Sequence, residues 1–194
     1  MACAAFSLAS RKCSPASRRE TAVLLRKLRH PDAHNSWAVE PGGILKNTVE
    51  HGQQRGVDLL TERKFPNFVV RYEYITPEDS NSGFYLRGRQ EIQILGDYKS
   101  GKATKGCDGA IYNFKAPDQF VTRPGGEWQT AEVTLIGDRI TVILNGVKIH
   151  DNVQCDQATG GELDRSMDQP GPILLQGDHG TVSFRNIRLK ELPE

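Results

Sequence analysis

Asn-Ser-Gly-Phe-Tyr-Leu-Arg-Gly-Arg-Gln-Glu-Ile-Gln-Ile-Leu, residues 81–95, is the stretch of sequence that decides the fold. Four of its apolar residues fall on even positions, whereas Tyr85 and four of its polar residues fall on odd positions. The even set is Phe84, Leu86, Ile92 and Ile94, and the odd set is Tyr85, Arg87, Arg89, Glu91 and Gln93. Strict alternation predicts one or two β-strands with an apolar face and a polar face, and Gly88 permits a bend between them.

The polar face of this stretch carries an aromatic ring, guanidinium groups, a carboxylate and an amide. These groups together favour a surface that binds a polyhydroxylated ligand. The alternation alone supports the solvated outer face of a β-sandwich equally well. Asn81, Ser82 and Gly83, at the start of the stretch, predict a turn that precedes the alternating residues.

The rest of the chain from residue 34 also shows strands separated by turns. Residues 68–75 form a β-branched and aromatic run, and residues 131–150 contain two hairpin turns, Gly137-Asp138 and Asn145-Gly146. Shorter strands are expected at 37–39, 43–45, 57–60, 110–114, 173–175 and 182–189, with a long loop over 151–170. Roughly ten short strands without a convincing helix predict an all-β, two-sheet antiparallel sandwich or jelly roll, and a closed barrel is the second choice.

Composition narrows the class of protein. The chain has 194 residues and a formal net charge of +1, so its overall charge does not favour binding to nucleic acid. No apolar run approaches the ~18 residues of a membrane span, and neither a dinucleotide-binding motif, a P-loop nor a Gly-x-Ser-x-Gly motif occurs. The four cysteines lack metal-ligand spacing, and Cys107 and Cys155 are expected to be isolated thiols.

Residues 1–33 differ from the remainder and are expected to be a basic extension outside the domain at 34–194. Seven Lys or Arg residues and one acid, Glu20, lie within residues 1–30. An Arg- and Ser-rich segment of this kind is typical of an organelle transit peptide, although a disordered or short helical extension fits equally. The apolar residues precede the basic ones, which is not the order of a secretory signal, so the sequence leaves the location of the protein open.

Seven motifs in fixed order give the chain a resemblance to a known family. They are residues 81–88, 91–95, 109–112, 124–128, 144–146, 171–180 and 184–187. Together they resemble the 3-keto-disaccharide hydrolase domain family, whose members have a concanavalin A-like jelly roll. The family usually opens with an additional strand that ends in Gly-Trp, which this sequence lacks. The resemblance implies that a sheet edge is exposed or that part of residues 1–33 replaces that strand.

The resemblance implies cleavage of sugars that carry a ketone at C3. The ketone acidifies the C2 proton, so a base forms an enolate, the C1 substituent leaves by β-elimination, and water adds to the enone. By this resemblance Glu91 is the base or a metal ligand, Arg87 holds the enolate oxygen or a hydroxyl, and His179, oriented by Asp178, is an acid–base group. The residues themselves leave open an ion pair of Glu91 with Arg87 or Arg89, and a merely solvated His179.

The remaining candidates would bind the sugar or a metal ion. The expected substrate-binding residues are Asn81, Tyr85, Gln93, Tyr112, Trp128 and Gln176. Packing at the rim of the core is an equally open role for Trp128. A divalent metal would stabilise the enolate, with His179, Glu91, Asp178 and Asp97 as ligands, and the 77–81 loop is a further candidate for calcium. Two other functions stay open, a non-catalytic carbohydrate-binding module and a domain that binds another protein.

Overall fold

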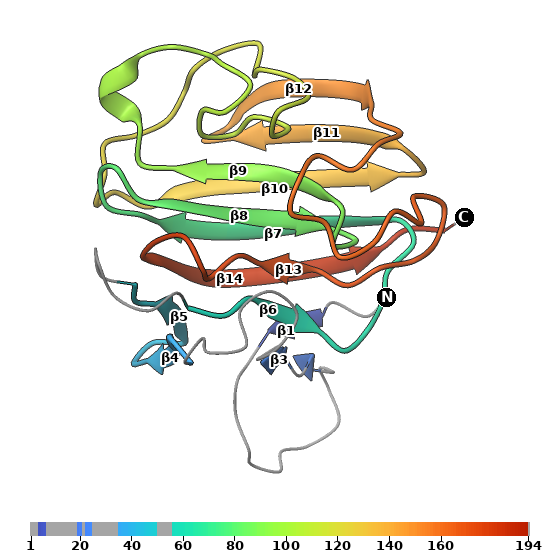
Figure 1. The fold of residues 1–194 in the computed structure, drawn as a ribbon, viewed down its shortest axis with the longest axis horizontal. Coiled ribbons are helices and arrows are strands. Elements are labelled where there is room, and N and C mark those ends of the chain that lie inside the picture. The colour runs from blue at the N-terminus through green and yellow to red at the C-terminus, as the bar shows by residue number, and fades with distance from the viewer. Residues whose placement is uncertain (1–3, 7–18, 21, 25–34, 50–55, 194) are drawn as a thin grey trace.

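Two β-sheets stack on each other in the computed structural model, which describes residues 4–6, 19–20, 22–24, 35–49 and 56–193 (Figure 1). The larger sheet has the order β12-β11-β10-β7-β14-β1-β2, with β5 also paired to β14 and β4 paired to β5. Its strands are β1 (Ala4–Phe6), β2 (Arg19–Glu20), β4 (Trp37–Glu40), β5 (Ile44–Asn47), β7 (Phe68–Ile75), β10 (Gln129–Ile136), β11 (Arg139–Leu144), β12 (Val147–Gln154) and β14 (Val182–Glu191).

The smaller sheet has the order β3-β6-β13-β8-β9. Its strands are β3 (Ala22–Leu24), β6 (Leu59–Thr61), β8 (Asn81–Leu86), β9 (Gln90–Leu95) and β13 (Leu174–Leu175). The one helical element of the described ranges is a short 3-10 turn, η1 (Tyr98–Ser100). All strand pairs are antiparallel except β1 with β2, so the predicted all-β antiparallel jelly-roll sandwich is confirmed.

The core lies between the two sheets and includes the even-numbered apolar residues of β7, β8 and β9. Tyr72 of the larger sheet stacks on Phe84 of the smaller sheet, with ring centroids 4.1 Å apart and planes within 2° of parallel. Phe184 of β14 packs beside both rings. Burial of these aromatic rings supplies both apolar area and specific ring contacts, which hold the two sheets in one orientation.

The stretch at 81–95 is a hairpin of β8 and β9. Arg87 and Gly88 form its two-residue turn with φ values of 51° and 69°, and the Arg89 amide donates to the Leu86 carbonyl at 3.0 Å. Positive φ at both positions matches the twist of the strands on either side. The expected turn at Asn81–Gly83 is wrong, because these residues pair with β9, Gly83 opposite Gln93, and begin β8.

The meander at 131–150 is confirmed as β10, β11 and β12, with Gly137 and Asn145-Gly146 at positive φ in its two turns.

The expected strand at 110–114 is wrong. Asn113 adopts a φ of 55°, and the chain folds back so that Phe114 and Lys115 donate to the Ile111 carbonyl. Only isolated bridges of Ile111 remain there.

Parts of the N-terminal region pair with both sheets. In β1, Ala4 lies opposite Leu189 of β14, so a piece of residues 1–33 does cover this edge of the larger sheet. Ala22–Leu24 pairs with β6 as β3, where the sequence allowed a short helix. The proposed targeting role concerns residues that lie mostly outside the described ranges, and the boundary between 33 and 34 stays a prediction. No helix that could span a membrane occurs in the described ranges.

Truncation of Phe84 tests the contact between the sheets. Phe84→Ala removes a fully buried ring that stacks on Tyr72. We expect the free energy of unfolding, measured by urea denaturation, to fall by about 3–5 kcal/mol. Val39→Ala, at a side chain that is 48% exposed, is the control and is expected to change it by less than about 0.5 kcal/mol. Equal effects of the two substitutions would show that the ring stack does not hold the sheets together.

Candidate functional site

The candidate site lies on the face of the smaller sheet that points away from the larger sheet. One row across this face is formed by Leu174, Tyr85 and Glu91, which occupy β13, β8 and β9 in register. The next row contains Gly83 and Gln93. The backbone N–H of Gln176 donates to the Gly83 carbonyl at 3.0 Å. Candidate residues that were far apart in the sequence are therefore neighbours on one surface.

Gly83 makes room for the carboxylate of Glu91. A Cβ atom at position 83 would lie 2.0 Å from Glu91 Oε1 and 2.8 Å from its Cδ. These distances are far below van der Waals contact, so only glycine leaves the carboxylate in this position. An isolated glycine inside a strand often marks such a close approach.

Hydrogen bonds fix both oxygens of the Glu91 carboxylate. The Tyr85 hydroxyl donates to Oε2 at 2.9 Å. With its amide nitrogen turned toward the acceptors, Gln93 donates to Oε1 at 3.3 Å and to the Ser82 carbonyl at 3.0 Å. Glu91 is 3% exposed. The carboxylate is thus held at a defined place on the sheet face rather than free in solvent, which is the preorganisation that a catalytic group requires.

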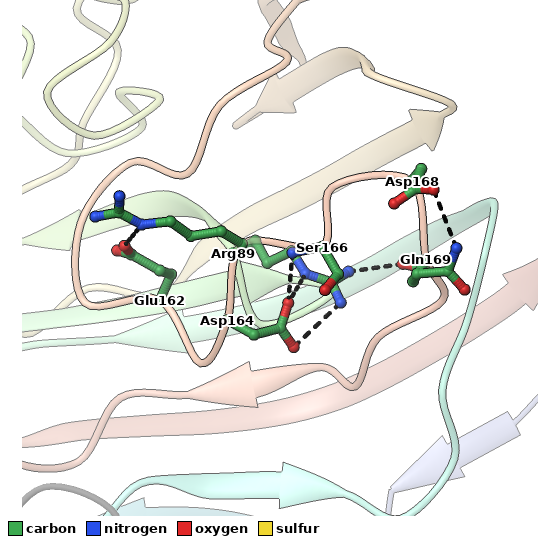
Figure 2. Close-up of polar contacts among 7 residues, drawn as sticks. Arg89, Glu162, Asp164, Ser166, Asp168 and Gln169 are labelled. Carbon is green, nitrogen blue, oxygen red and sulfur yellow. Dashed lines mark hydrogen bonds and ion pairs between the residues drawn. The ribbon is translucent and has the colours of Figure 1, made fainter.

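The loop that follows β12 is fastened over the end of this hairpin by Arg89. The Arg89 guanidinium donates to both carboxylate oxygens of Asp164, at 2.6 and 3.2 Å, and to the Gln169 carbonyl at 2.6 Å. Figure 2 shows how these groups face one another. Asp164 also accepts the Ser166 amide at 2.8 Å. The hydrogen bonds from Arg89 lower the pKa of Asp164, and the paired contact fixes both the position and the orientation of the loop.

The same loop contacts the candidate site directly. The Glu91 amide donates to Thr159 Oγ1 at 2.9 Å, and the Thr159 amide donates to the Arg89 carbonyl. Leu163 packs against Tyr85, together with Leu174 and Leu60. The long loop expected after residue 150 therefore forms a wall beside Tyr85 and Glu91.

Asp178 and His179 lie on the loop that follows β13. His179 Nδ1 contacts Asp178 Oδ1; Asp178 is buried, whereas the His179 ring is exposed. The loop is held by Asn47, whose amide donates to the carbonyls of Gly177 and Gly180. The contact with Asp178 assigns the proton to Nδ1 in the neutral ring and leaves Nε2 to exchange a proton with a ligand.

The edge of β9 is covered by residues 106–112, which bring Tyr112 to the site. The Tyr112 amide donates to the Glu91 carbonyl at 3.0 Å, and the Gly109 amide donates to the Gln93 carbonyl at 2.9 Å. Two buried groups tie this segment to the larger sheet. Asp108 accepts hydrogen bonds from the Tyr74 hydroxyl at 2.8 and 2.9 Å, and His150 Nε2 lies 2.9 Å from the Gly109 carbonyl.

Burial shifts the titration of both of these groups. Desolvation raises the pKa of Asp108 from 3.8 to about 7, opposed by hydrogen bonds from Tyr74, the Leu95 amide and Thr122. Desolvation lowers the pKa of His150 from 6.5 to about 4, so the ring is neutral near pH 7 and donates from Nε2 to the Gly109 carbonyl. As the pH rises from about 4 to about 7, the raised pKa of Asp108 lowers the stability of the fold, whereas the lowered pKa of His150 increases it.

Two expected site residues lie elsewhere. The turn at residues 87 and 88 takes Arg87 off the sheet face, and its guanidinium donates to the Gly137 carbonyl of the larger sheet at 2.6 Å. Burial lowers the pKa of Arg87. Trp128 precedes β10 of the larger sheet, where the Arg185 guanidinium lies 3.9 Å from its ring centroid. The structure therefore brings neither residue to the Glu91 side chain.

The expected metal ligands do not form a recognisable centre. Asp97 precedes η1, and burial raises its pKa. Across residues 35–49 and 56–193, together with the short N-terminal strands, no group of three or more His, Cys, Asp or Glu side chains is placed to hold a metal ion. Cys107 and Cys155 are both free, buried thiols.

The sequence analysis missed four residues that shape the candidate site. Gly83 carried a signal, since a glycine followed by alternating residues indicates a close approach within a strand. The buried Asp108, the loop ligand of Arg89 and the hydroxyl of Thr159 gave no comparable signal. Their partners lie between 13 and 75 residues away along the chain, and only the fold brings them together.

Residues 27–190 match the sequence model of a protein family, the 3-keto-α-glucoside-1,2-lyase-like domain family. No protein of curated function matches the sequence. Solved structures with the same fold include two proteins of Parabacteroides distasonis ATCC 8503 that are provisionally described as glycosyl hydrolases. One has 20% identity and a TM-score of 0.66, covering 82% of this chain and 85% of its own. The other has 26% identity and a TM-score of 0.62, covering 85% of this chain and 93% of its own.

A third structure shows that the fold also occurs in binding modules. It is the carbohydrate-binding module CBM66 of Bacillus subtilis, with 12% identity and a TM-score of 0.54, covering 88% of this chain and 95% of its own. At this identity the likeness concerns the fold alone. It agrees with the sandwich architecture that the alternating residues predicted.

Substitution of Gly83 tests whether its missing side chain accommodates Glu91. We expect Gly83→Ala to lower the free energy of unfolding by about 1–3 kcal/mol, because the new methyl group overlaps the carboxylate. In a Glu91→Ala background the same change is expected to cost less, since the overlapping atoms are gone. Gly106→Ala is the control, because no atom lies within 4 Å of its added Cβ. Equal costs of Gly83→Ala in both backgrounds would contradict the assignment.

Asp108 makes a testable contribution to the pH dependence of stability. Its pKa is raised in the folded state, so its stabilising effect is complete below about pH 4 and is lost as the pH rises through about 7. Asp108→Asn removes this effect and keeps an acceptor for Tyr74. The variant is expected to gain stability relative to the wild type between pH 4 and pH 7.5, by at most about 4 kcal/mol.

Urea denaturation at several pH values checks this prediction for Asp108. The comparison is made as the difference between the variant and the wild type, because His150 contributes the opposite slope to both proteins. A difference that does not change with pH would contradict the raised pKa of Asp108.

Proposed function

The chain belongs to the 3-keto-α-glucoside-1,2-lyase-like domain family, and on this basis we propose that it cleaves 3-keto-glycosides. In the proposed reaction a base removes the C2 proton, the C1 substituent is expelled by β-elimination, and water adds to the resulting enone. The proton from C2 goes to the base, the electron pair of the C1–O bond leaves with the aglycone oxygen, and an acid supplies the proton that this oxygen needs.

The placement of Glu91 supports this proposal most strongly. Its carboxylate lies over Gly83 on the sheet face, and the Tyr85 hydroxyl and the Gln93 amide hold its two oxygens. Each carboxylate oxygen has a further lone pair with which to accept a proton. We assign the removal of the C2 proton to Glu91.

Asp178 and His179 supply the second proton-transfer group in this proposal. Asp178 contacts Nδ1 of the imidazole, while the exposed ring keeps Nε2 for the substrate. Imidazole exchanges protons near neutral pH. We therefore assign His179 to the aglycone oxygen, which it protonates as the C1 bond breaks, and Asp178 to orienting the ring.

Two amide side chains beside Gly83 offer acceptors for sugar hydroxyls. Gln176 Oε1 and Asn81 Oδ1 are buried and have no hydrogen-bond partner among the residues that the structure describes. A buried oxygen without a partner costs free energy that a ligand hydroxyl would recover. Tyr112 is the proposed stacking residue. The Tyr85 ring is buried among leucines and holds Glu91 through its hydroxyl instead. Arg87 and Trp128 have no part in the proposed reaction, because they contact the larger sheet.

A non-catalytic carbohydrate-binding function is the second candidate. The same sheet face, with its aromatic and amide groups, would bind a sugar without any proton transfer. The two functions differ in the role of the Glu91 carboxylate. An enzyme needs it for turnover, whereas a binding module needs it only to shape the surface that holds the sugar.

The test uses a glucoside oxidised at C3 and its unoxidised parent, with the released aglycone measured by mass spectrometry, each with and without a chelator. We expect release from the keto sugar alone, and incorporation of deuterium at C2 of the product in heavy water. Glu91→Gln keeps the size of the side chain and is expected to lower the rate by about 10²–10⁴-fold with little loss of sugar binding. Glu127→Gln, at an exposed position, is the control and should retain full activity.

Two results would contradict the elimination reaction. Equal cleavage of both glucosides would indicate direct hydrolysis without a C3 ketone. Sugar binding without cleavage of either compound, unchanged in Glu91→Gln, would establish the binding module instead. Loss of release upon chelation alone would add a metal ion to the reaction.

A further inference from the structure

A groove of about 530 Å³ lies on the outer face of the larger sheet, away from Glu91. It crosses β11, β10, β7 and β14. Its principal polar lining residues are Arg71, Glu73, Thr130, Glu132, Asn186 and Arg188. A shift of register in β14 between Arg185 and Arg188, with Asn186 at a φ of 54°, distorts the strand at one side of the groove. Such a bulge re-aims the side chains around it.

Three arginines, Arg71, Arg188 and the adjoining Arg185, surround only two carboxylates at the groove, so one positive charge is left over. The Glu132 carboxylate accepts a hydrogen bond from the Arg71 guanidinium. The Glu73 carboxylate accepts hydrogen bonds from Asn186 at 2.6 Å and from Arg185 at 2.7 Å, and these contacts lower the pKa of Glu73. Both carboxylates are therefore already engaged. Arg188 has no acidic partner among the described residues.

Arg188 also lies directly opposite Arg71 in the pairing of β14 with β7. Both side chains are on the solvent side of the sheet and are exposed. Like charges at directly opposed positions of an antiparallel pair repel each other and destabilise the sheet. An anion bound between them removes this repulsion, and a planar guanidinium donates two parallel hydrogen bonds to a carboxylate or sulfate group.

We propose that this groove binds an acidic oligosaccharide, with a sugar carboxylate or sulfate group held between Arg71 and Arg188. Thr130, which pairs with Glu73 across the sheet, and Asn186, whose side-chain nitrogen donates to Glu73, line the same groove. The Thr130 hydroxyl and Asn186 Oδ1 would bind sugar hydroxyls. Ile143 adds an apolar patch for the carbon face of a ring. The site is a second binding surface, on the opposite sheet from Glu91, and it does not depend on the proposed reaction.

The lining favours a saccharide over a small inorganic ion. A free ion would use only the two arginines, whereas the groove extends over four strands and has the volume of an ordinary small-ligand site. Its hydroxyl, amide and carboxylate groups alternate with cations, so they suit a ligand that carries many hydroxyl groups and one charge.

Isothermal titration with the full chain tests the proposal. The ligands are a tetrasaccharide of hexuronate units, a sulfated tetrasaccharide of a neutral sugar, the same neutral tetrasaccharide without sulfate, and inorganic sulfate. We expect one or both acidic tetrasaccharides to bind more tightly than the neutral one and than inorganic sulfate. The acidic tetrasaccharide that binds shows whether the groove prefers a carboxylate or a sulfate group. The affinity should fall as the salt concentration is raised.

Variants separate this groove from the rest of the surface. Arg188→Ala and Arg71→Ala are each expected to weaken binding of the acidic tetrasaccharide by about tenfold or more. Lys190→Ala is the matched control, an exposed cation of the same strand that does not line the groove. Tyr112→Ala, at the proposed stacking residue beside the other sheet, should leave this affinity unchanged, whereas a loss would place the ligand at that sheet instead.

Three results would overturn the proposal. They are equal affinity for the acidic and neutral tetrasaccharides, an affinity no higher than that for inorganic sulfate, and equal effects of Arg188→Ala and Lys190→Ala. Each would show that the groove is a general cationic surface or that it binds no saccharide.

Discussion

The register of β8 against β9 is the constraint on which the core and the candidate site both depend. The two-residue turn at Arg87 and Gly88 sets this register. It directs Phe84 toward Tyr72 in the core and places Tyr85 beside Glu91 on the other face. Because side chains alternate along a strand, a slip of one residue would exchange the two faces. The stack of aromatic rings therefore holds the catalytic candidate in place as well as the sheets.

Contacts from outside the hairpin then restrict the place of Glu91. Gly83 supplies space beneath the carboxylate, while Thr159 and the 106–112 segment bind its backbone on the open edge of β9. Arg89 fastens the loop that carries Thr159, and Asp108 fastens the segment that carries Tyr112. Residues outside the hairpin thus determine where the carboxylate of Glu91 lies, as is usual for a group held on a rigid sheet.

The sequence was sufficient to predict the fold and part of the candidate site, for a physical reason. Alternation fixes which side of a strand is buried, so Tyr85, Glu91 and Gln93 were correctly placed on one face. The bounds of β7 and the turns of the meander follow from local preferences. Arg87 was misplaced because a turn interrupts the alternation at that residue, and the expected strand at 110–114 failed because Asn113 reverses the chain. Trp128 lies just before a strand of the other sheet, which no local pattern reveals.

A structure of the complex with a non-cleavable C-glycoside of a 3-keto sugar tests the central claim most directly. The C1 substituent of this compound is joined through carbon and cannot leave. We predict that the sugar lies on the face of β8 and β9, with C2 about 3–3.5 Å from a carboxylate oxygen of Glu91 and the C1 substituent toward His179. A sugar bound with C2 turned away from Glu91, or seated only on the outer face of β7 and β10, would contradict the account.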